Sequence, residues 1–221
     1  MAGGRKEPQL NTIIMFALVQ SGSITQYLNG NKGITIGDTQ YPRAIFTLWS
    51  EAERNAIGIY TIAIDETNRK SEEYYINTDI TYSFTGSAVT GAYGTATAKA
   101  LDDVNATDDE GNELYNDDST PIVIKGLKTI KKQIIRQQAA SLLAKTDWYV
   151  VKATEVEAYS VPADITTYRA AVRTRSNEME AAIDACADVD ALKELYEYTN
   201  TGTEENPLNT RPLGEWPAEV S

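Results

Sequence analysis

The side chains with the clearest capacity for chemistry are the carboxylates of residues 102–118, a stretch with eight acids and no base. They are Asp102, Asp103, Asp108, Asp109, Glu110, Glu113, Asp117 and Asp118. Clustered oxygen ligands are what Ca²⁺ prefers. The run from Asp108 to Glu113 lacks the alternating ligand spacing and the distal glutamate of a calcium loop. We therefore predict a solvated loop here and no metal site.

Other side chains offer weaker patterns. Glu155, Glu157 and Asp164 could form a carboxylate pair for glycoside cleavage, but nothing nearby fixes two of them across a groove, which favours plain surface charge. Ser21 lacks a nucleophile-elbow motif, and residues 91–94 lack the Lys-Ser/Thr that follows a phosphate loop. The chain has no histidine, the commonest general base and metal ligand. The sequence predicts no catalytic residue and no cofactor, and hence a protein that is not an enzyme.

The composition limits the kinds of molecule that this protein is expected to bind. The chain has 221 residues, with 20 basic and 32 acidic side chains and a net charge of −12, which disfavours a phosphate backbone as partner. Cys186 is the single cysteine and excludes an internal disulfide. No apolar run reaches the roughly 18 residues of a membrane span. Four tyrosines in the first half could contact protein or carbohydrate, although ordinary sheet packing is the simpler interpretation. They are Tyr74, Tyr75, Tyr82 and Tyr93.

The pattern predicts an α+β protein with a small, antiparallel β-rich N-terminal domain, then a helical hairpin with a short third helix. Its parts are a flexible N-terminal segment (1–14), a β-rich domain (15–100), an acidic linker (101–121), a helical domain (122–200) and an irregular tail (201–221). No internal repeat is apparent.

Local signals in the first half are turns and one helix start. A Gly/Ser turn between the apolar runs Ile13–Val19 and Ile24–Leu28 predicts a hairpin. Residues 34–36 and 44–49 read as strands around a Pro-containing loop. Ser50 and Glu53 have the spacing of a capping box, and Gly58 suits the position after that helix.

The second half has a reversed charge pattern and helical periodicity. Residues 122–146 carry six bases and no acid. Apolar residues at three- and four-residue spacing predict a helix that packs against a partner helix more than in a long coiled coil. They are Leu127, Ile130, Ile134, Ile135, Leu142 and Leu143. Asp164 is expected to cap the second helix, downstream of Pro162, and Asp188 the third.

Five residues are predicted to be structural anchors without a catalytic role. Trp148, after Asp147, is expected to fix the turn between helices in the core. Arg169, next to Tyr168, is expected to pair with a carboxylate such as Asp147. The fifth anchor is Trp49.

Two segments carry a family resemblance. The sequence KKQIIRQQAASLLAKTDWYVVKATE followed by VPADITTYRAAVRTRS, within Ile130–Arg175, resembles the C-terminal region of tail-fibre-assembly-like and tail-associated proteins of tailed bacteriophages. The segment YPRAIFTLWSEAERNAIGIY, within Gln40–Tyr60, resembles the N-terminal portion of the same family. The middle of this chain, residues 65–120, is longer than is usual in that family.

The resemblance implies a virion structural or adaptor protein of the tail, tail fibre or baseplate, made in the bacterial cytoplasm. Its partners would be other tail or fibre proteins, within a homo-oligomer or ring, with neither nucleic acid nor membrane as partner. The long middle segment leaves two alternatives open. One is an assembly chaperone that does not stay in the virion, and the other is a tail-borne glycan-binding or depolymerising module.

Overall fold

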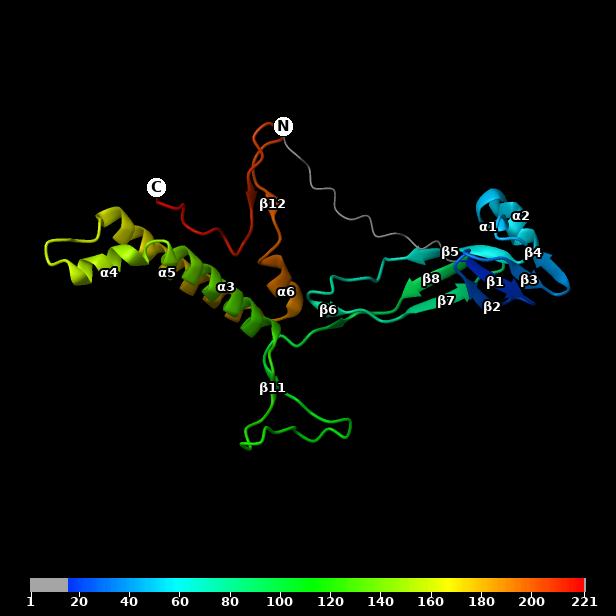
Figure 1. The fold of residues 1–221 in the computed structure, drawn as a ribbon, viewed down its shortest axis with the longest axis horizontal. Coiled ribbons are helices and arrows are strands. Elements are labelled where there is room, and N and C mark those ends of the chain that lie inside the picture. Colours follow the sequence, from blue (N-terminus) through cyan, green and yellow to red (C-terminus); the bar gives the residue numbers. More distant parts are fainter. Residues whose placement is uncertain (1–15, 221) are drawn as a thin grey trace. The chain divides into compact units, whose positions relative to one another are not determined.

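The computed structural model describes residues 16–220, so the predicted flexible N-terminal segment, residues 1–14, lies outside the described part. The protein is α+β, with a β-rich N-terminal half and helices in the C-terminal half (Figure 1). The chain divides into two compact units between Thr97 and Ala98. The sequence prediction placed the end of the β-rich domain at residue 100.

The first unit is built on a curled sheet of five strands in the order β2-β1-β5-β8-β7. The elements of this half are β1 (Phe16–Gln20), β2 (Ser23–Leu28), β3 (Ile34–Ile36), β4 (Thr39–Tyr41), α1 (Ile45–Leu48), α2 (Glu51–Ala56), β5 (Ile59–Asp65), β6 (Tyr75–Ile76), β7 (Ile80–Phe84), β8 (Val89–Tyr93) and β9 (Thr97–Ala98). The predicted hairpin is confirmed, because β1 and β2 pair antiparallel around Ser21 and Gly22.

The expectation of a purely antiparallel domain is wrong. Strands β5 and β8 run parallel, with Ile62 opposite Val89, so the sheet is mixed. A second correction concerns residues 44–49, which form helix α1 and not a strand. Residues Ile45 and Phe46 of this short helix are buried against one face of the sheet. A two-residue apolar alternation could not distinguish that helical turn from a strand.

Strand β1 is apolar along its length because both of its faces are buried. Phe16 and Leu18 pack with α1 on one face, while Ala17 and Val19 pack with Val89 on the other. A strand covered on both sides reads as a continuous apolar run. The sheet curls far enough that its edge strands β2 and β7 approach each other through the rings of Tyr27 and Tyr82, 4.9 Å apart.

Helix α2 begins as the sequence predicts. The Ser50 hydroxyl accepts from the Glu53 backbone N–H at 3.3 Å, and the Glu53 carboxylate accepts from the Ser50 backbone N–H at 2.7 Å. The Ser50 hydroxyl also donates to the Glu53 carboxylate at 2.7 Å, and this hydrogen bond, followed by the one from the Ser50 backbone N–H, lowers the pKa of Glu53. Both partners lie within one helical turn, so sequence spacing alone was sufficient to predict them.

Replacing Ser50 with alanine should reduce the free energy of unfolding by about 1 kcal/mol at neutral pH. Because the pKa of Glu53 is lower in the folded state, its ionised form stabilises that state above its unfolded pKa, and this contribution is lost as the pH falls through the folded pKa. The difference between wild type and Ser50→Ala should therefore shrink in acid. Urea titrations of both proteins at several pH values would measure it, and a difference independent of pH would contradict the ionic part of the cap.

The second unit contains a projecting segment and the main helices. Its elements after β9 are β10 (Val104–Asn105), β11 (Val123–Ile124), α3 (Leu127–Ala144), α4 (Asp147–Glu155), α5 (Ala163–Asp184), α6 (Val189–Glu194), β12 (Thr199–Asn200) and β13 (Asn209–Thr210). Helices α3 and α5 pack along each other around Ala139, Tyr168 and Val172, with Trp216 of the tail against the same cluster.

The predicted caps of the later helices have different outcomes. Asp188 caps α6 by accepting from the Ala191 backbone N–H at 2.8 Å, as predicted. The prediction for Asp164 is wrong, because the N-cap of α5 is Pro162 and Asp164 lies in the first turn. There its carboxylate accepts from the Ile165 backbone N–H and places a negative charge at the helix start. The helix α4, between α3 and α5, was not predicted.

Candidate interaction surfaces

Residues 102–125, which we call the arm, project from the start of α3 (Figure 1). Three backbone hydrogen bonds connect three residues of the arm in a closed cycle. The Ala106 N–H donates to the Ile122 carbonyl at 2.7 Å, Leu114 donates to Ala106 at 2.8 Å, and Ile122 donates to Leu114 at 2.8 Å. Ala106, Leu114 and Ile122 are spaced eight residues apart. Beyond each of the three hydrogen bonds, the two backbone segments continue as a short antiparallel pair. The arm is therefore a set of three short hairpins that share one centre.

Two of these hairpins repeat each other, which corrects the expectation of no internal repeat. Bridges join Thr107 to Glu113 and Tyr115 to Pro121, eight residues later. In each loop the backbone N–H of the second residue donates to the carbonyl four residues on, at 3.0 Å and 2.8 Å. The equivalent positions Gly111 and Ser119 both have positive φ, 87° and 63°. A repeat of eight residues with different side chains at most positions escapes a search for sequence identity.

The acids of the arm shape its loops. Asp108 accepts from the backbone N–H groups of Glu110 and Asn112, each at 2.9 Å, and its pKa is lowered, first by the Asn112 side chain. Glu113 accepts from the side chains of Asn105 and Tyr115, at 2.9 Å and 2.8 Å, which lower its pKa. Asparagine and aspartate favour such turns because their side chains replace backbone partners. The acidic run is consistent with a loop-forming role.

The arm has almost no core of its own. Ala106 is its one buried residue, with 8% of its surface exposed. The large apolar side chains of the arm are exposed by between 37% and 54%, and they are Val104, Leu114, Tyr115, Ile122, Val123 and Ile124. Contiguous exposed apolar side chains mark protein interaction sites. Because a two-stranded ladder alone is marginally stable in water, the arm is suited to being covered by another protein surface.

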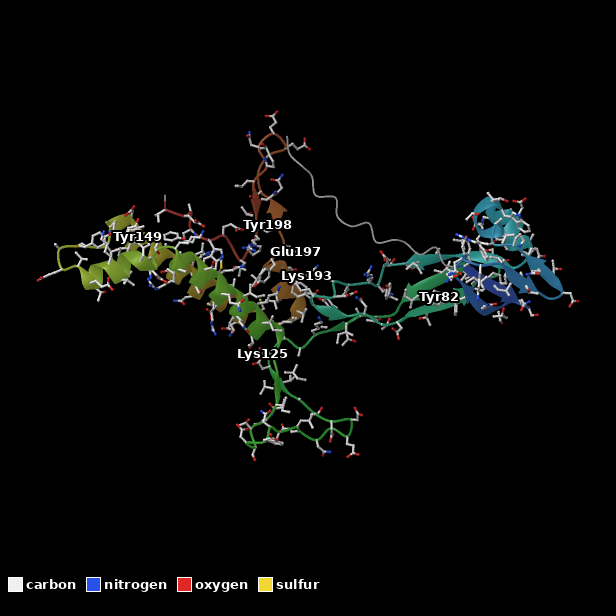
Figure 2. All side chains as sticks on the ribbon, in the orientation of Figure 1. Tyr82, Lys125, Tyr149, Lys193, Glu197 and Tyr198 are labelled. Carbon is white, nitrogen blue, oxygen red and sulfur yellow. The ribbon has the colours of Figure 1, made fainter. Side chains whose placement is uncertain are left out.

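The base of the arm is fixed to α3, so the expected linker is an ordered projection. Asp103 accepts from the Gly126 backbone N–H at 2.8 Å, and that hydrogen bond is the first cause of its lowered pKa. Asp102 pairs with Lys128 at 3.3 Å. Both carboxylates thereby lie at the N-terminus of α3, where the helix dipole favours negative charge. Lys125 is labelled at the same junction in Figure 2.

The bases of α3, by contrast, pair within the unit. Lys132 contacts Asp184 at 2.6 Å, and Arg136 holds Glu180 of α5 with two donors. Lys131 is buried at 6% exposure over the ring of Tyr196, 4.3 Å away. The basic side chains of α3 thus join it to the rest of its own unit, and one of them, Lys128, pairs with the acidic segment through Asp102.

The predicted pair of Arg169 and Asp147 is confirmed, with Nη2 and Oδ1 2.8 Å apart. Arg169 is buried and also donates through Nη1 to the Leu143 carbonyl at 2.9 Å and to the Thr146 hydroxyl at 2.7 Å. One guanidinium from α5 thus joins the last turn of α3 to the first turn of α4. The C-terminal carbonyls of a helix lack partners within the helix, and a cation there is favourable.

The other expected anchors divide between buried and exposed. Tyr168 is buried at 5% exposure, and Trp49 packs against the cluster of the first unit with its ring edge-on to Tyr41. The expectation for Trp148 is wrong, because 52% of it is exposed. Its ring lies 3.7 Å from that of Tyr149, which Figure 2 labels. Helical periodicity did not reveal that residues 147–155 form a separate helix with an uncovered face.

The tyrosines of the first unit largely follow the packing interpretation, since Tyr74 and Tyr75 are 5% exposed. A cavity of about 490 Å³ in this unit is lined mainly by apolar groups, including Leu28, Ile34 and Phe46. Within residues 16–220, no group of three histidine, cysteine or acidic side chains is arranged to hold a metal ion. Nor does any helix in that range have the length and apolar character to cross a membrane.

The interaction surfaces that sequence reasoning missed are the arm and the open face of α4. A usable signal for the arm was the recurrence of Asn/Asp residues and turn formers at eight-residue intervals, with β-branched residues on either side. Comparison with known proteins adds no further identification: no family model, no curated protein and no solved structure matches this chain.

Proposed function

We propose that this chain is a structural or adaptor protein of a tailed-bacteriophage virion, in the tail, tail fibre or baseplate, and that it acts by protein–protein assembly. The observation that carries the proposal is the arm, an ordered projection with exposed apolar side chains and almost no core. The phage assignment rests on the resemblance of Gln40–Tyr60 and Ile130–Arg175 to tail-associated proteins.

The two resembling segments would have different tasks. Gln40–Tyr60 contains α1, which packs against one face of the first sheet, and α2, which leads into β5. Ile130–Arg175 contains most of α3, all of α4 and half of α5. In this proposal α3 and α5 form a helical hairpin, with α6 as the short third helix, that supports the arm. The partners are other tail or fibre proteins, and association energy comes from buried apolar and aromatic surface.

Quantitative mass spectrometry of density-banded particles from the parent phage tests the proposal. A fixed copy number per particle is expected, in keeping with the rotational symmetry of a tail. Absence from particles, with abundance in the infected-cell lysate, would contradict virion membership and favour the assembly chaperone.

Complementation with an arm variant tests the observation itself. Val123→Asp with Ile124→Asp changes two side chains that are 50% and 54% exposed, so the fold should persist while incorporation into particles falls. A control with Leu48→Asp and Ile76→Asp alters apolar side chains in the first unit that are more exposed still, 79% and 60%. Equal incorporation of both variants would contradict a role for the arm.

A further inference from the structure

Helices α3 and α4 share an open seam with the spacing of a coiled coil. Seven residues follow each other at alternating intervals of four and three, and all are exposed. They are Ile130, Ile134, Gln137, Ser141, Ala144, Trp148 and Val151. In sequence this is the a/d spacing of a heptad repeat, and the same count resumes in α4 after Lys145 and Thr146, the two residues that separate it from α3. Figure 1 draws α4 beyond the C-terminal end of α3.

The seam is distinct from the face that packs on α5. The packed face of α3 contains Leu127, Ile135 and Ala139, which are 8% exposed or less. On the open face, Ile130 and Ile134 are 42% and 40% exposed, and Trp148 and Val151 of α4 are 52% and 53% exposed. A helix that faced only solvent would carry charged residues at these positions. The sequence places no charge at any of the seven.

The lack of charge matters because the chain is strongly acidic. Two copies with a net charge of −12 each repel one another over most contact geometries. Along α3, however, Lys128, Lys132 and Arg136 are paired with acids of their own chain. A neutral and mostly apolar seam, on a helix whose charges elsewhere are balanced, is a surface on which identical copies can meet.

The residues beside the seam favour a second copy over an unrelated partner. With Ile134, Ser141 and Trp148 at a positions, Asp147 takes a g position and Lys152 the following e position. In parallel, in-register copies these two positions face each other across the interface. Asp147 keeps 59% of its side chain exposed while it pairs with Arg169. The seam therefore brings opposite charges together between copies.

We propose that the protein self-associates through the open seam of α3 and α4, in a parallel coiled-coil contact with a second copy of this chain. The contact draws on Ile130 to Ala144 of α3, about 20 Å at 1.5 Å per helical residue, and on Trp148 and Val151 of α4. Packing on α5 and the guanidinium of Arg169 already hold α3 and the start of α4 in place. Association therefore costs little conformational entropy in this segment. This contact is independent of virion membership and is tested separately from it.

Light scattering after size exclusion, with the full chain over a range of concentrations, tests the proposal. The wild type should reach a multiple of 24.3 kDa. Ile130→Glu with Ile134→Glu should give the mass of one chain with an unchanged circular-dichroism spectrum, because both side chains are exposed and glutamate favours helix. The matched control, Leu48→Glu with Ile76→Glu, adds the same charge elsewhere and should keep the wild-type mass.

Two further variants test the register. Lys152→Glu places like charges across the seam and should weaken association, whereas Lys152→Arg should not. Ser141→Cys should form a disulfide-linked dimer on oxidation, since equivalent residues face each other, and the exposed Ser87→Cys should not. A wild type that stays monomeric at every concentration, or a seam double variant as large as wild type, would overturn the proposal. So would a seam occupied only by a different protein.

Discussion

Replacing Arg169 with alanine should lower the free energy of unfolding by about 3 kcal/mol, a large effect for one side chain. The substitution removes donors from the Leu143 carbonyl at 2.9 Å and the Thr146 hydroxyl at 2.7 Å. Thr146 is 5% exposed, so water cannot readily replace the lost donor. Hydrogen bonds from charged donors to buried acceptors contribute about 1.5–3 kcal/mol each, which accounts for the expected loss.

The pair with Asp147 should contribute little of that loss. Asp147 keeps 59% of its side chain exposed, and exposed ion pairs are worth about 0–1 kcal/mol. Asp147→Asn should therefore be nearly neutral, while Arg169→Lys should lose most of the stabilisation, because one ammonium cannot reproduce the guanidinium's spread of donors. Urea denaturation followed by the fluorescence of Trp148 and Trp216 measures the series. A loss for Arg169→Ala no larger than that for the exposed Arg173→Ala would contradict this role.

Sequence reasoning succeeded where both partners lie close together in the chain. The Ser50–Glu53 capping box and the Asp188 cap depend on three-residue spacing, which the sequence displays directly. The α+β class also followed from periodicity. The pairing of Arg169 with Asp147 was predicted as an attraction between opposite charges near the turn after the first helix, and it is present although helix α4 lies between α3 and α5.

The failures concern contacts between distant segments. Periodicity shows that α3 has apolar faces, but it does not show which face α5 covers, so Ile130 and Ile134 were assigned to the buried side. Lys131 is one of the six bases of residues 122–146, yet it is 6% exposed, and its ammonium lies over the ring of Tyr196, far along the chain. The parallel pairing of β5 with β8 likewise depends on a long connection with no sequence signature.

The arm shows a different kind of failure. Its acidic, polar composition is typical of a solvated linker. Its order instead comes from backbone hydrogen bonds closed among Ala106, Leu114 and Ile122. Composition does not reveal which backbone groups pair, and the eight-residue recurrence of Asn, Asp and turn formers is easily missed because most side chains differ between the two loops. The surfaces proposed for assembly, the arm and the seam, thus lie where local patterns and tertiary packing give different answers.

Replacing Gly58 with alanine should destabilise the first unit by about 3 kcal/mol. Gly58 follows α2 with φ of +83° and donates its backbone N–H to Asn55. Its carbonyl accepts from the Val19 N–H at 2.8 Å. A Cβ at this position would lie 2.5 Å from the Val19 carbonyl oxygen, which belongs to the inner strand β1, paired on both sides by β2 and β5, and cannot move alone. Left-handed strain of about 1–2 kcal/mol adds to that clash.

A second glycine separates the two causes. Gly37 has φ of +59°, yet a Cβ there would meet nothing within 4 Å. Gly37→Ala should therefore show the conformational strain alone, about 1–2 kcal/mol, and the difference between the two variants measures the contact with β1. In a background with Trp148→Phe and Trp216→Phe, Trp49 fluorescence reports the unfolding of this unit, because Trp49 packs against its core. Equal losses for the two alanines would mean that β1 yields to the methyl group, and that the junction of α2 and β5 is held less tightly than its geometry implies.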